Sequence, residues 1–260
     1  KHIHVNELSE QSPIKSTKHQ KKSFSSLYKI AASLLILFVS YFGYQEFIKE
    51  TAKNKNVALQ VETIVKQNPA GRKSTIKLPD GSIVKLNSES QISFPSKFIG
   101  DRREITLSGE AFLEVAHDAN RPFIVKTGNL ETKVLGTSFN ISAYPSLQTQ
   151  KIALLNGKVK VFDVEKNMEI LLAPGEMVTT AAKGLVKSGF DYDTEFGWKD
   201  GKLVFNNADN KEIFERLEKW FGYKIISEKR ISRELYTSTF SNESLEEILL
   251  IIGESKEFDF

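Results

Sequence analysis

The feature that most constrains this chain is an uncharged, mostly apolar run near its start, from Ile30 to Gln45, bounded by Lys29 and Glu46. A helix that crosses a bilayer needs about 20 such residues, with a lower limit of about 17. Flanking apolar residues and a lysine that reaches the interface can extend the run. Its apolar residues occur on all sides, with no polar stripe, unlike a helix packed on a soluble core. We therefore predict one transmembrane helix over residues 29–48.

The charges that flank this run predict its direction. Residues 15–29 contain five lysines and no acidic residue, whereas the lysines after the run are mixed with Glu46 and Glu50. Because lysine and arginine near a span favour the cytoplasmic side, we expect residues 1–28 to be a cytoplasmic tail. Residues 49–70 would form a juxtamembrane linker to a larger part outside.

From Arg72 onward the apolar residues alternate with polar ones, which is typical of half-buried strands. Asp80-Gly81 lies between two such alternating runs, a strong hairpin signal. The strands expected after it are 104–107, 111–115, 123–126, 131–134, 139–143, 151–154, 158–162 and 169–172. We expect no helix between Arg72 and Thr180. The pattern predicts a mainly-β domain over residues 71–190, built as a sandwich, a barrel or a short β-solenoid.

The pattern changes after Asp191, and residues 191–260 predict a small α/β unit of order β-α-β-β-α. A strand over 201–205 precedes a helix whose apolar residues recur at helical spacing and which ends at Gly222. Strands are expected at Tyr223–Ile226 and Tyr236–Phe240. Ser244 and Glu247 have capping-box spacing and open the last helix. Residues 258–260 would begin a closing strand, so we expect the unit to be truncated.

Composition excludes several function classes. The chain has no cysteine, so thiol catalysis, disulfides and cysteine-ligated zinc are excluded. The net charge of +3 does not indicate direct binding of nucleic acid, which needs basic residues gathered on one face of a domain. His2 and His4 lack a third ligand for a metal, and His117 is expected in a surface loop. No glycine pattern for binding phosphates occurs, so we predict neither a metal nor a cofactor.

Glu110 and Glu114 are the best candidates for a catalytic carboxylate pair. On one strand they share a face and lie about 13 Å apart, wider than the roughly 5–9.5 Å of glycosidase pairs. Arg103 or Arg121 would be their expected charge partners. We therefore predict that the protein is not an enzyme of this kind.

Six short runs, in order, resemble the FecR family of transmembrane anti-sigma regulators. They are Leu78-Pro-Asp-Gly-Ser-Ile-Val-Lys-Leu-Asn87, Leu107-Ser-Gly-Glu-Ala-Phe-Leu-Glu-Val115, Arg121-Pro-Phe-Ile-Val125, Val134-Leu-Gly-Thr-Ser-Phe-Asn-Ile141, Leu155-Asn-Gly-Lys-Val159 and Leu172-Ala-Pro-Gly-Glu176. The segment from Trp198 onward resembles the small STN-like domain often fused to such proteins. The likeness covers most of the chain after the apolar run.

This resemblance implies a signalling protein of the Gram-negative inner membrane, with its bulk in the periplasm. Its partners would be an extracytoplasmic-function sigma factor inside and the signalling domain of a TonB-dependent outer-membrane transducer outside. It would control uptake genes for iron chelates or glycans. Residues 1–28 would be the remnant of a sigma-binding domain.

Two sets of site residues follow from the resemblance and the expected strands. Some family members cleave themselves at a Gly-Thr bond that corresponds here to Gly136-Thr137, where a hydroxyl could attack a strained peptide. Otherwise Gly136 simply makes a turn and Thr137 lies in a strand. A partner strand could add to an exposed edge formed by Tyr223, Lys224, Ile225 and Ile226, or by Tyr236, Thr237, Ser238, Thr239 and Phe240.

Two other function classes remain as alternatives to signalling. One is a membrane-tethered periplasmic carbohydrate-binding β module, for which exposed aromatic residues would be needed. The other is an envelope enzyme, which the poor supply of catalytic groups disfavours.

Overall fold

The structure is a computed structural model that describes residues 25–58, 61–226 and 232–256. The chain divides into two compact units, residues 1–59 and 60–260, and each is treated by itself. His2, His4 and the expected closing strand at 258–260 lie outside the described residues.

The predicted membrane span lies within one long helix, α1 (Ser25–Ala58). Many of its apolar side chains between Leu34 and Ile48 are exposed. In the described part of the chain, no helix combines the length and apolarity required to cross a membrane. The structure therefore does not show the predicted transmembrane helix over 29–48.

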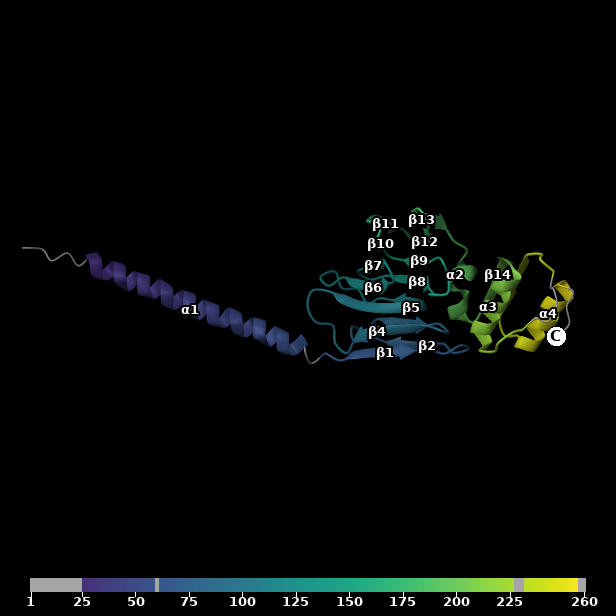
Figure 1. Cartoon of the computed structure of the whole chain (residues 1–260), viewed down its shortest axis with the longest axis horizontal. Coiled ribbons are helices and arrows are strands. Elements are labelled where there is room, and N and C mark those ends of the chain that lie inside the picture. The colour runs from purple at the N-terminus through teal and green to yellow at the C-terminus, as the bar shows by residue number, and fades with distance from the viewer. Residues whose placement is uncertain (1–24, 59–60, 227–231, 257–260) are drawn as a thin grey trace, which may run out of the picture. The chain divides into compact units, whose positions relative to one another are not determined.

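Residues 61–189 form a mainly-β domain, as predicted (Figure 1). Its strands are β1 (Thr63–Gln67), β2 (Ser74–Lys77), β3 (Ile83–Leu86), β4 (Gln91–Pro95), β5 (Arg103–Glu114), β6 (Phe123–Thr127), β7 (Leu130–Val134), β8 (Ser138–Ala143), β9 (Lys151–Asn156), β10 (Val159–Asp163), β11 (Met168–Leu172), β12 (Glu176–Ala181) and β13 (Gly184–Gly189). The main sheet order is β11-β10-β7-β6-β5-β8-β9-β12-β13; β2 and β3 extend from β5 on one side, and β4 and β1 on the other.

The long strand β5 joins the two halves of this sheet. Its first half pairs with β4 and β6, and its second half with β3 and β8. Gly109 lies at the change of partners with φ +98°, and a Cβ there would collide with Ser90. All the strand pairs described in this domain are antiparallel except β5–β6. The result is a near-barrel sheet built from hairpins, so the short β-solenoid alternative is wrong.

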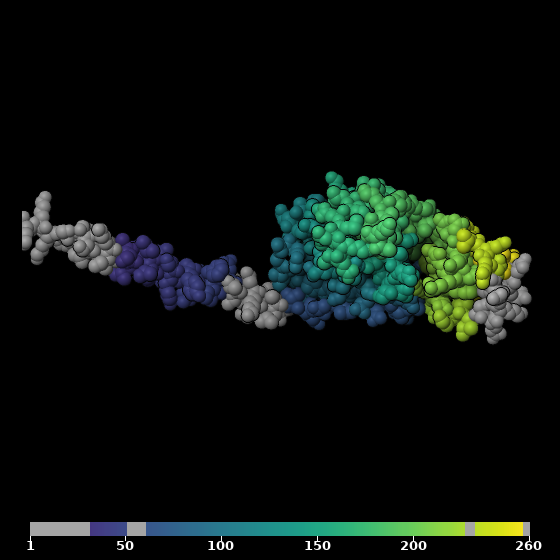
Figure 2. All heavy atoms as spheres, turned by 45° about the horizontal axis from the view of Figure 1, so that its top comes forward, coloured from purple at the N-terminus to yellow at the C-terminus, as the bar shows by residue number. Residues whose placement is uncertain are grey.

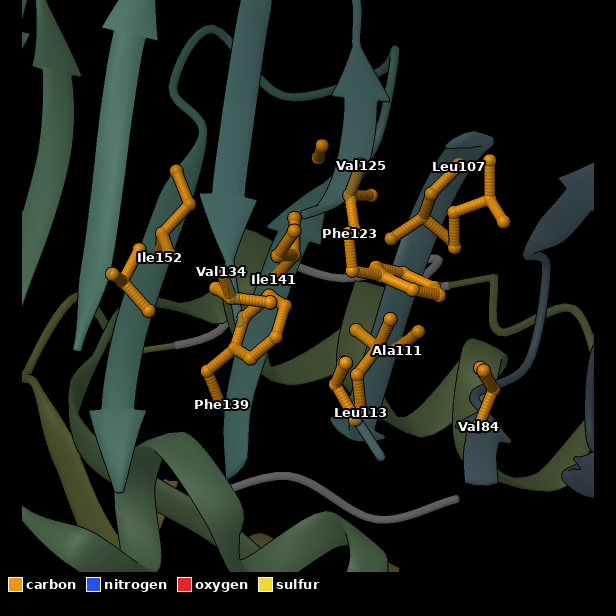
Figure 3. Packing of buried hydrophobic residues seen from close by; sticks show 14 of the residues in the cluster. Val84, Leu107, Ala111, Leu113, Phe123, Val125, Val134, Phe139, Ile141 and Ile152 are labelled. Atoms are coloured by element: carbon orange, nitrogen blue, oxygen red, sulfur yellow. The ribbon is translucent and has the colours of Figure 1, made fainter. Parts of the chain in front are cut away.

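The core fills the space between the two halves of the sheet. Figure 3 shows Phe123 from β6 and Phe139 from β8 among aliphatic side chains of β3, β5 and β9. Both phenylalanines are fully buried. Each such side chain stabilises the fold by about 1.5–3 kcal/mol relative to an exposed one. Both residues therefore belong to the core of the β domain.

The alternating pattern failed to predict four strands, β1, β4, β12 and β13. β1 has one half-buried and four exposed residues, so its sequence shows little apolar alternation. Together with the end of α1, it lies in the stretch 49–70 that was predicted to be a linker. β1 forms a strand because it pairs with the neighbouring strand β4.

The C-terminal unit contains α2 (Tyr192–Phe196), η1 (Gly197–Asp200), β14 (Leu203–Ala208), α3 (Asn210–Phe221), β15 (Tyr236–Phe240) and α4 (Leu245–Lys256). β14 and β15 form a two-stranded antiparallel sheet. Phe205, Leu217 and Ile248 belong to its separate core. The prediction of a strand at Tyr223–Ile226 is wrong, because these residues are irregular and pair with no described strand. The described order is therefore β-α-β-α after the α2–η1 segment, which sequence analysis missed.

The helix ends of this unit agree with their predicted signals. Asp209 accepts a hydrogen bond from the Glu212 N–H at 2.8 Å and begins α3, and Gly222 ends it with φ +80°. Ser244 and Glu247 exchange the reciprocal bonds of a capping box at the start of α4. These local contacts fix where α3 and α4 begin.

Candidate functional site

A cleft of about 390 Å³ lies where the β domain meets the C-terminal unit. Figure 2 shows the C-terminal elements packed against the β domain along this boundary. Asn87 and Glu110 line the cleft from the β domain, and Trp198, Lys219 and Trp220 line it from η1 and α3. The volume lies within the range of clefts that hold small ligands.

Backbone contacts join the two parts beside the cleft. The carbonyl of Lys219, near the end of α3, accepts hydrogen bonds from the Gly71 N–H at 2.9 Å and from the Ser88 hydroxyl. A Cβ on Gly71 would lie only 2.8 Å from the Phe221 carbonyl oxygen, and one on Gly222 only 3.0 Å from the Ala70 carbonyl oxygen. Glycine at both positions therefore permits the close approach. We call this contact, residues 69–73 and 88 against 198 and 219–222, the seam.

Lys73 connects both tryptophans of the chain at the seam. Its ammonium lies 3.0 Å from the centre of the Trp220 ring and donates to the Trp198 carbonyl at 3.3 Å. Such a cation over an indole ring is attractive, more so when water is excluded. Burial lowers the pKa of Lys73 to about 8, against the raising influence of Glu110. The seam is thus formed by specific side-chain contacts as well as by backbone contacts.

Glu110 anchors a hydrogen-bonded network that crosses from β5 to η1. Its two carboxylate oxygens accept from the Asn87 amide at 2.7 Å and the Asn140 amide at 2.9 Å. The Asn140 carbonyl oxygen in turn accepts from the Trp198 indole N–H at 3.2 Å. Burial raises the pKa of Glu110, and the two amide hydrogen bonds oppose this only in part. No lysine or arginine among the described residues forms an ion pair with this carboxylate.

The raised pKa gives a pH-dependent prediction for Glu110→Gln. The folded state holds the Glu110 proton more tightly than the unfolded chain, so this group's contribution to stability falls as pH rises from the unfolded pKa of about 4.3 through the raised folded value. Glutamine does not titrate, and its cost in mismatched amide contacts is the same at every pH. The free energy of unfolding of the variant, relative to wild type, should therefore increase as pH rises above about 4. Urea unfolding checks this, and a difference that stays constant with pH contradicts it.

The charge partners predicted for the two glutamates are wrong. Arg103 instead forms a buried ion pair with Asp80 at 2.8 Å, and Arg121 pairs with Asp118 at 2.9 Å. Glu114 is exposed at the end of β5. Sequence reasoning also missed Asn140, although a polar residue between Phe139 and Ile141 in a predicted buried strand was a usable signal.

Gly136 and Thr137 lie in the bend between β7 and β8. The Thr137 side chain is buried, and its hydroxyl donates to the Lys158 carbonyl at 3.1 Å. Gly136 packs against His117: a Cβ there would lie 2.6 Å from His117 Nδ1. Gly136 is not among the residues with positive φ. These contacts explain both residues as parts of a tight bend, and self-cleavage stays a prediction.

The two predicted partner-binding edges differ in the structure. β15 (Tyr236–Phe240) is a strand that pairs with β14 on one side, with Thr237 and Thr239 exposed. Tyr223 and Ile226 are exposed in an irregular segment, where the Ile225 N–H donates to the Glu218 carboxylate. Of the two predicted segments, β15 is the one that forms a strand in the described part of the chain, as strand addition requires.

Two family models match the sequence: "FecR protein" over residues 65–160 and "FecR, C-terminal" over residues 202–260. The two matched regions lie on opposite sides of the seam. A comparison with curated proteins finds no match.

Two similar solved structures are both described as a "putative anti-sigma factor" from Parabacteroides distasonis ATCC 8503. The one determined at 1.65 Å is 30% identical with a TM-score of 0.67, covering 74% of this chain and 91% of its own. The one determined at 2.50 Å is 29% identical with a TM-score of 0.67, covering 75% of this chain and 92% of its own. The similarity covers about three quarters of the chain.

Proposed function

Because the chain belongs to the FecR family, we propose that it regulates a sigma factor, with the β domain and the C-terminal unit receiving the signal together. The observation that carries the proposal is the 30% identity, over 74% of the chain, to a protein described as an anti-sigma factor. The seam supports joint action, because it joins the two matched regions through the contact of Lys73 with Trp220 and through the backbone. A binding event at one region can then change the other.

We further propose the partners that the sequence resemblance implies. The sigma factor is of the extracytoplasmic-function class, and the incoming signal comes from the signalling domain of a TonB-dependent outer-membrane transducer. The regulated genes serve uptake of a nutrient such as an iron chelate or a glycan. The support is family membership and the exposed edge of β15, which can accept a strand from a partner.

The cellular location is a proposal as well. We place residues 61–256 in the periplasm, attached to the inner membrane, and residues 1–28 on the cytoplasmic side. The support is the lysine excess of residues 15–29 and the exposed apolar side chains of α1. Added protease should degrade the β domain in spheroplasts but not in intact cells. Protection in spheroplasts would contradict the placement.

The transducer proposal is tested by mixing the full chain with the signalling domain of the transporter encoded beside it. We expect a complex in a pull-down and slower amide exchange at residues 236–240, because an added strand would protect those N–H groups. Absence of a complex between two folded partners contradicts the proposal. Binding of glycans by the chain, without binding to the signalling domain, would favour the carbohydrate-binding module instead.

Self-cleavage at Gly136-Thr137 predicts a distinct pattern in a set of variants. If the Thr137 hydroxyl attacks the Gly136 carbonyl, the peptide bond is replaced by an ester, which water then hydrolyses, so wild type and Thr137→Ser should appear as two fragments on a gel. Thr137→Ala and Thr137→Val should stay whole, because both lack the hydroxyl. A wild type that runs as one band would show that the buried Thr137 serves the bend alone.

A further inference from the structure

The cleft beside the seam contains two charged groups that form no ion pair among the described residues. Most of its charged side chains are paired across the cleft wall or along α3. The pairs are Lys151–Glu195 at 3.2 Å, Lys202–Asp193 at 2.8 Å, Lys211–Glu215 at 3.9 Å and Arg216–Glu212 at 2.7 Å. Asp209 also lines the cleft and is used as the cap of α3. Among the described residues that line the cleft, one carboxylate and one ammonium remain, those of Glu110 and Lys219.

The Glu110 carboxylate is fixed in a position from which it can accept a hydrogen bond from a ligand in the cleft. The amides of Asn87 and Asn140 each donate to one of its oxygens, which fixes the carboxylate in place. Each oxygen of an ionised carboxylate can accept a further hydrogen bond. Asn140 is itself held by the Trp198 indole N–H, so the acceptor direction is set by the surrounding fold.

Lys219 supplies the opposite charge from α3. Its ammonium lies 4.0 Å from the centre of the Tyr144 ring. It forms no ion pair with any acidic side chain of the described residues. Its backbone is fixed, because the Lys219 carbonyl accepts from Gly71 and Ser88 at the seam. The cleft therefore presents a positive group from the C-terminal unit and a negative group from the β domain.

We propose that this cleft binds a small zwitterion, an α-amino acid or a short peptide with free termini, whose ammonium group meets Glu110 and whose carboxylate meets Lys219. Such a ligand would neutralise both unmatched groups at once and would bridge the two parts of the protein beside the seam. A sugar fits less well. Lys73 already lies over the Trp220 ring and Lys219 over the Tyr144 ring, and Trp198 is only 8% exposed. These rings are therefore not available for stacking on a sugar. This inference does not depend on the proposed sigma-factor role.

Titration calorimetry of the full chain with three probes tests the proposal. Alanyl-alanine carries both charges, N-acetyl-alanyl-alanine lacks the ammonium, and alanyl-alanine amide lacks the carboxylate. We expect alanyl-alanine to bind, and removal of either charge to weaken binding about tenfold or more, as expected for a charge-assisted hydrogen bond. A neutral disaccharide serves as the fourth probe and should not bind.

Variants assign the two ends of the ligand. Glu110→Gln should weaken the binding of alanyl-alanine about tenfold and remove its advantage over the N-acetyl probe. Lys219→Met should also weaken the binding of alanyl-alanine about tenfold, and it should remove the advantage over the amide probe. Lys187→Met is the matched control, because Lys187 forms an ion pair with Glu176 on β12 and β13 and does not line the cleft; it should bind like wild type. Circular dichroism verifies that all three variants are folded.

Three outcomes would overturn the proposal. One is no heat from alanyl-alanine at millimolar concentration with folded protein, as expected if Glu110 and Lys219 only pair with each other when the cleft closes. Another is equal binding of all charged and blocked probes, which would show nonspecific association. The third is stronger binding of the disaccharide than of alanyl-alanine, which would show that the cleft is a glycan-binding site instead.

Discussion

Replacing Arg103 by alanine is expected to lower the free energy of unfolding by about 3–5 kcal/mol, because it leaves a buried acid without its partner. The Arg103 side chain is 1% exposed and pairs with Asp80, which is 5% exposed. Its guanidinium also donates to the carbonyls of Ala116 and Arg121 at 2.8 and 2.9 Å. All three acceptors would lose the hydrogen bond from Arg103 together, although Asp80 keeps those from Ser82.

The neighbouring residue supplies the control for this prediction. Arg102 is 60% exposed and lies 3.5 Å from Glu104, so Arg102→Ala should change the free energy of unfolding by less than about 0.5 kcal/mol. Urea unfolding followed by circular dichroism measures both variants. Similar losses for the two arginines would show that the buried ion pair does not stabilise the β domain.

Gly71→Ala is expected to open the seam. The glycine has φ +74°, where an L-residue costs about 1–2 kcal/mol. The new Cβ would also lie 2.8 Å from the Phe221 carbonyl oxygen and 2.9 Å from its carbon, which are backbone atoms that cannot turn aside. The C-terminal unit must therefore move away from the β domain.

Tryptophan fluorescence reports this change directly, because the chain's two tryptophans, Trp198 and Trp220, both lie at the seam. We expect Gly71→Ala to shift the emission to longer wavelength and to speed proteolysis near residues 190–202. Gly100→Ala is the matched control: its φ is +86°, yet a Cβ added there would have no atom within 4 Å. It should lose stability without a fluorescence shift. Unchanged emission in Gly71→Ala would show that the seam tolerates a Cβ.

Features set by neighbouring residues could be predicted from the sequence. The Asp80-Gly81 turn is present, with Gly81 at φ +88° and the Ser82 N–H bonded to the Asp80 carboxylate. It joins β2 to β3, and Ile76 faces Val84 across the hairpin. Likewise, Gly222 predicted the end of α3, and the capping-box spacing of Ser244 and Glu247 predicted the start of α4. Each of these signals depends on contacts within a few positions of the chain.

Features that depend on distant segments could not be predicted. Asp80 and Arg103 are 23 positions apart, and no local pattern indicates that they meet. Asn140 and Trp198 are 58 positions apart. Tyr223–Ile226 shows the opposite failure: its composition suits a strand, but the structure gives it no ladder partner, and the Glu218 carboxylate takes the Ile225 N–H. Strands form only where another strand supplies hydrogen bonds.

The central claim, regulation of a sigma factor, is tested most directly by RNA abundance in the host organism with the gene deleted, restored, and restored as Gly71→Ala. We predict that deletion changes one set of transcripts that share a promoter recognised by a single alternative sigma factor. The wild-type gene should reverse the change, and the Gly71→Ala gene should not respond normally to the inducing nutrient. Identical transcript levels with and without the gene, in the presence and absence of that nutrient, would contradict the claim.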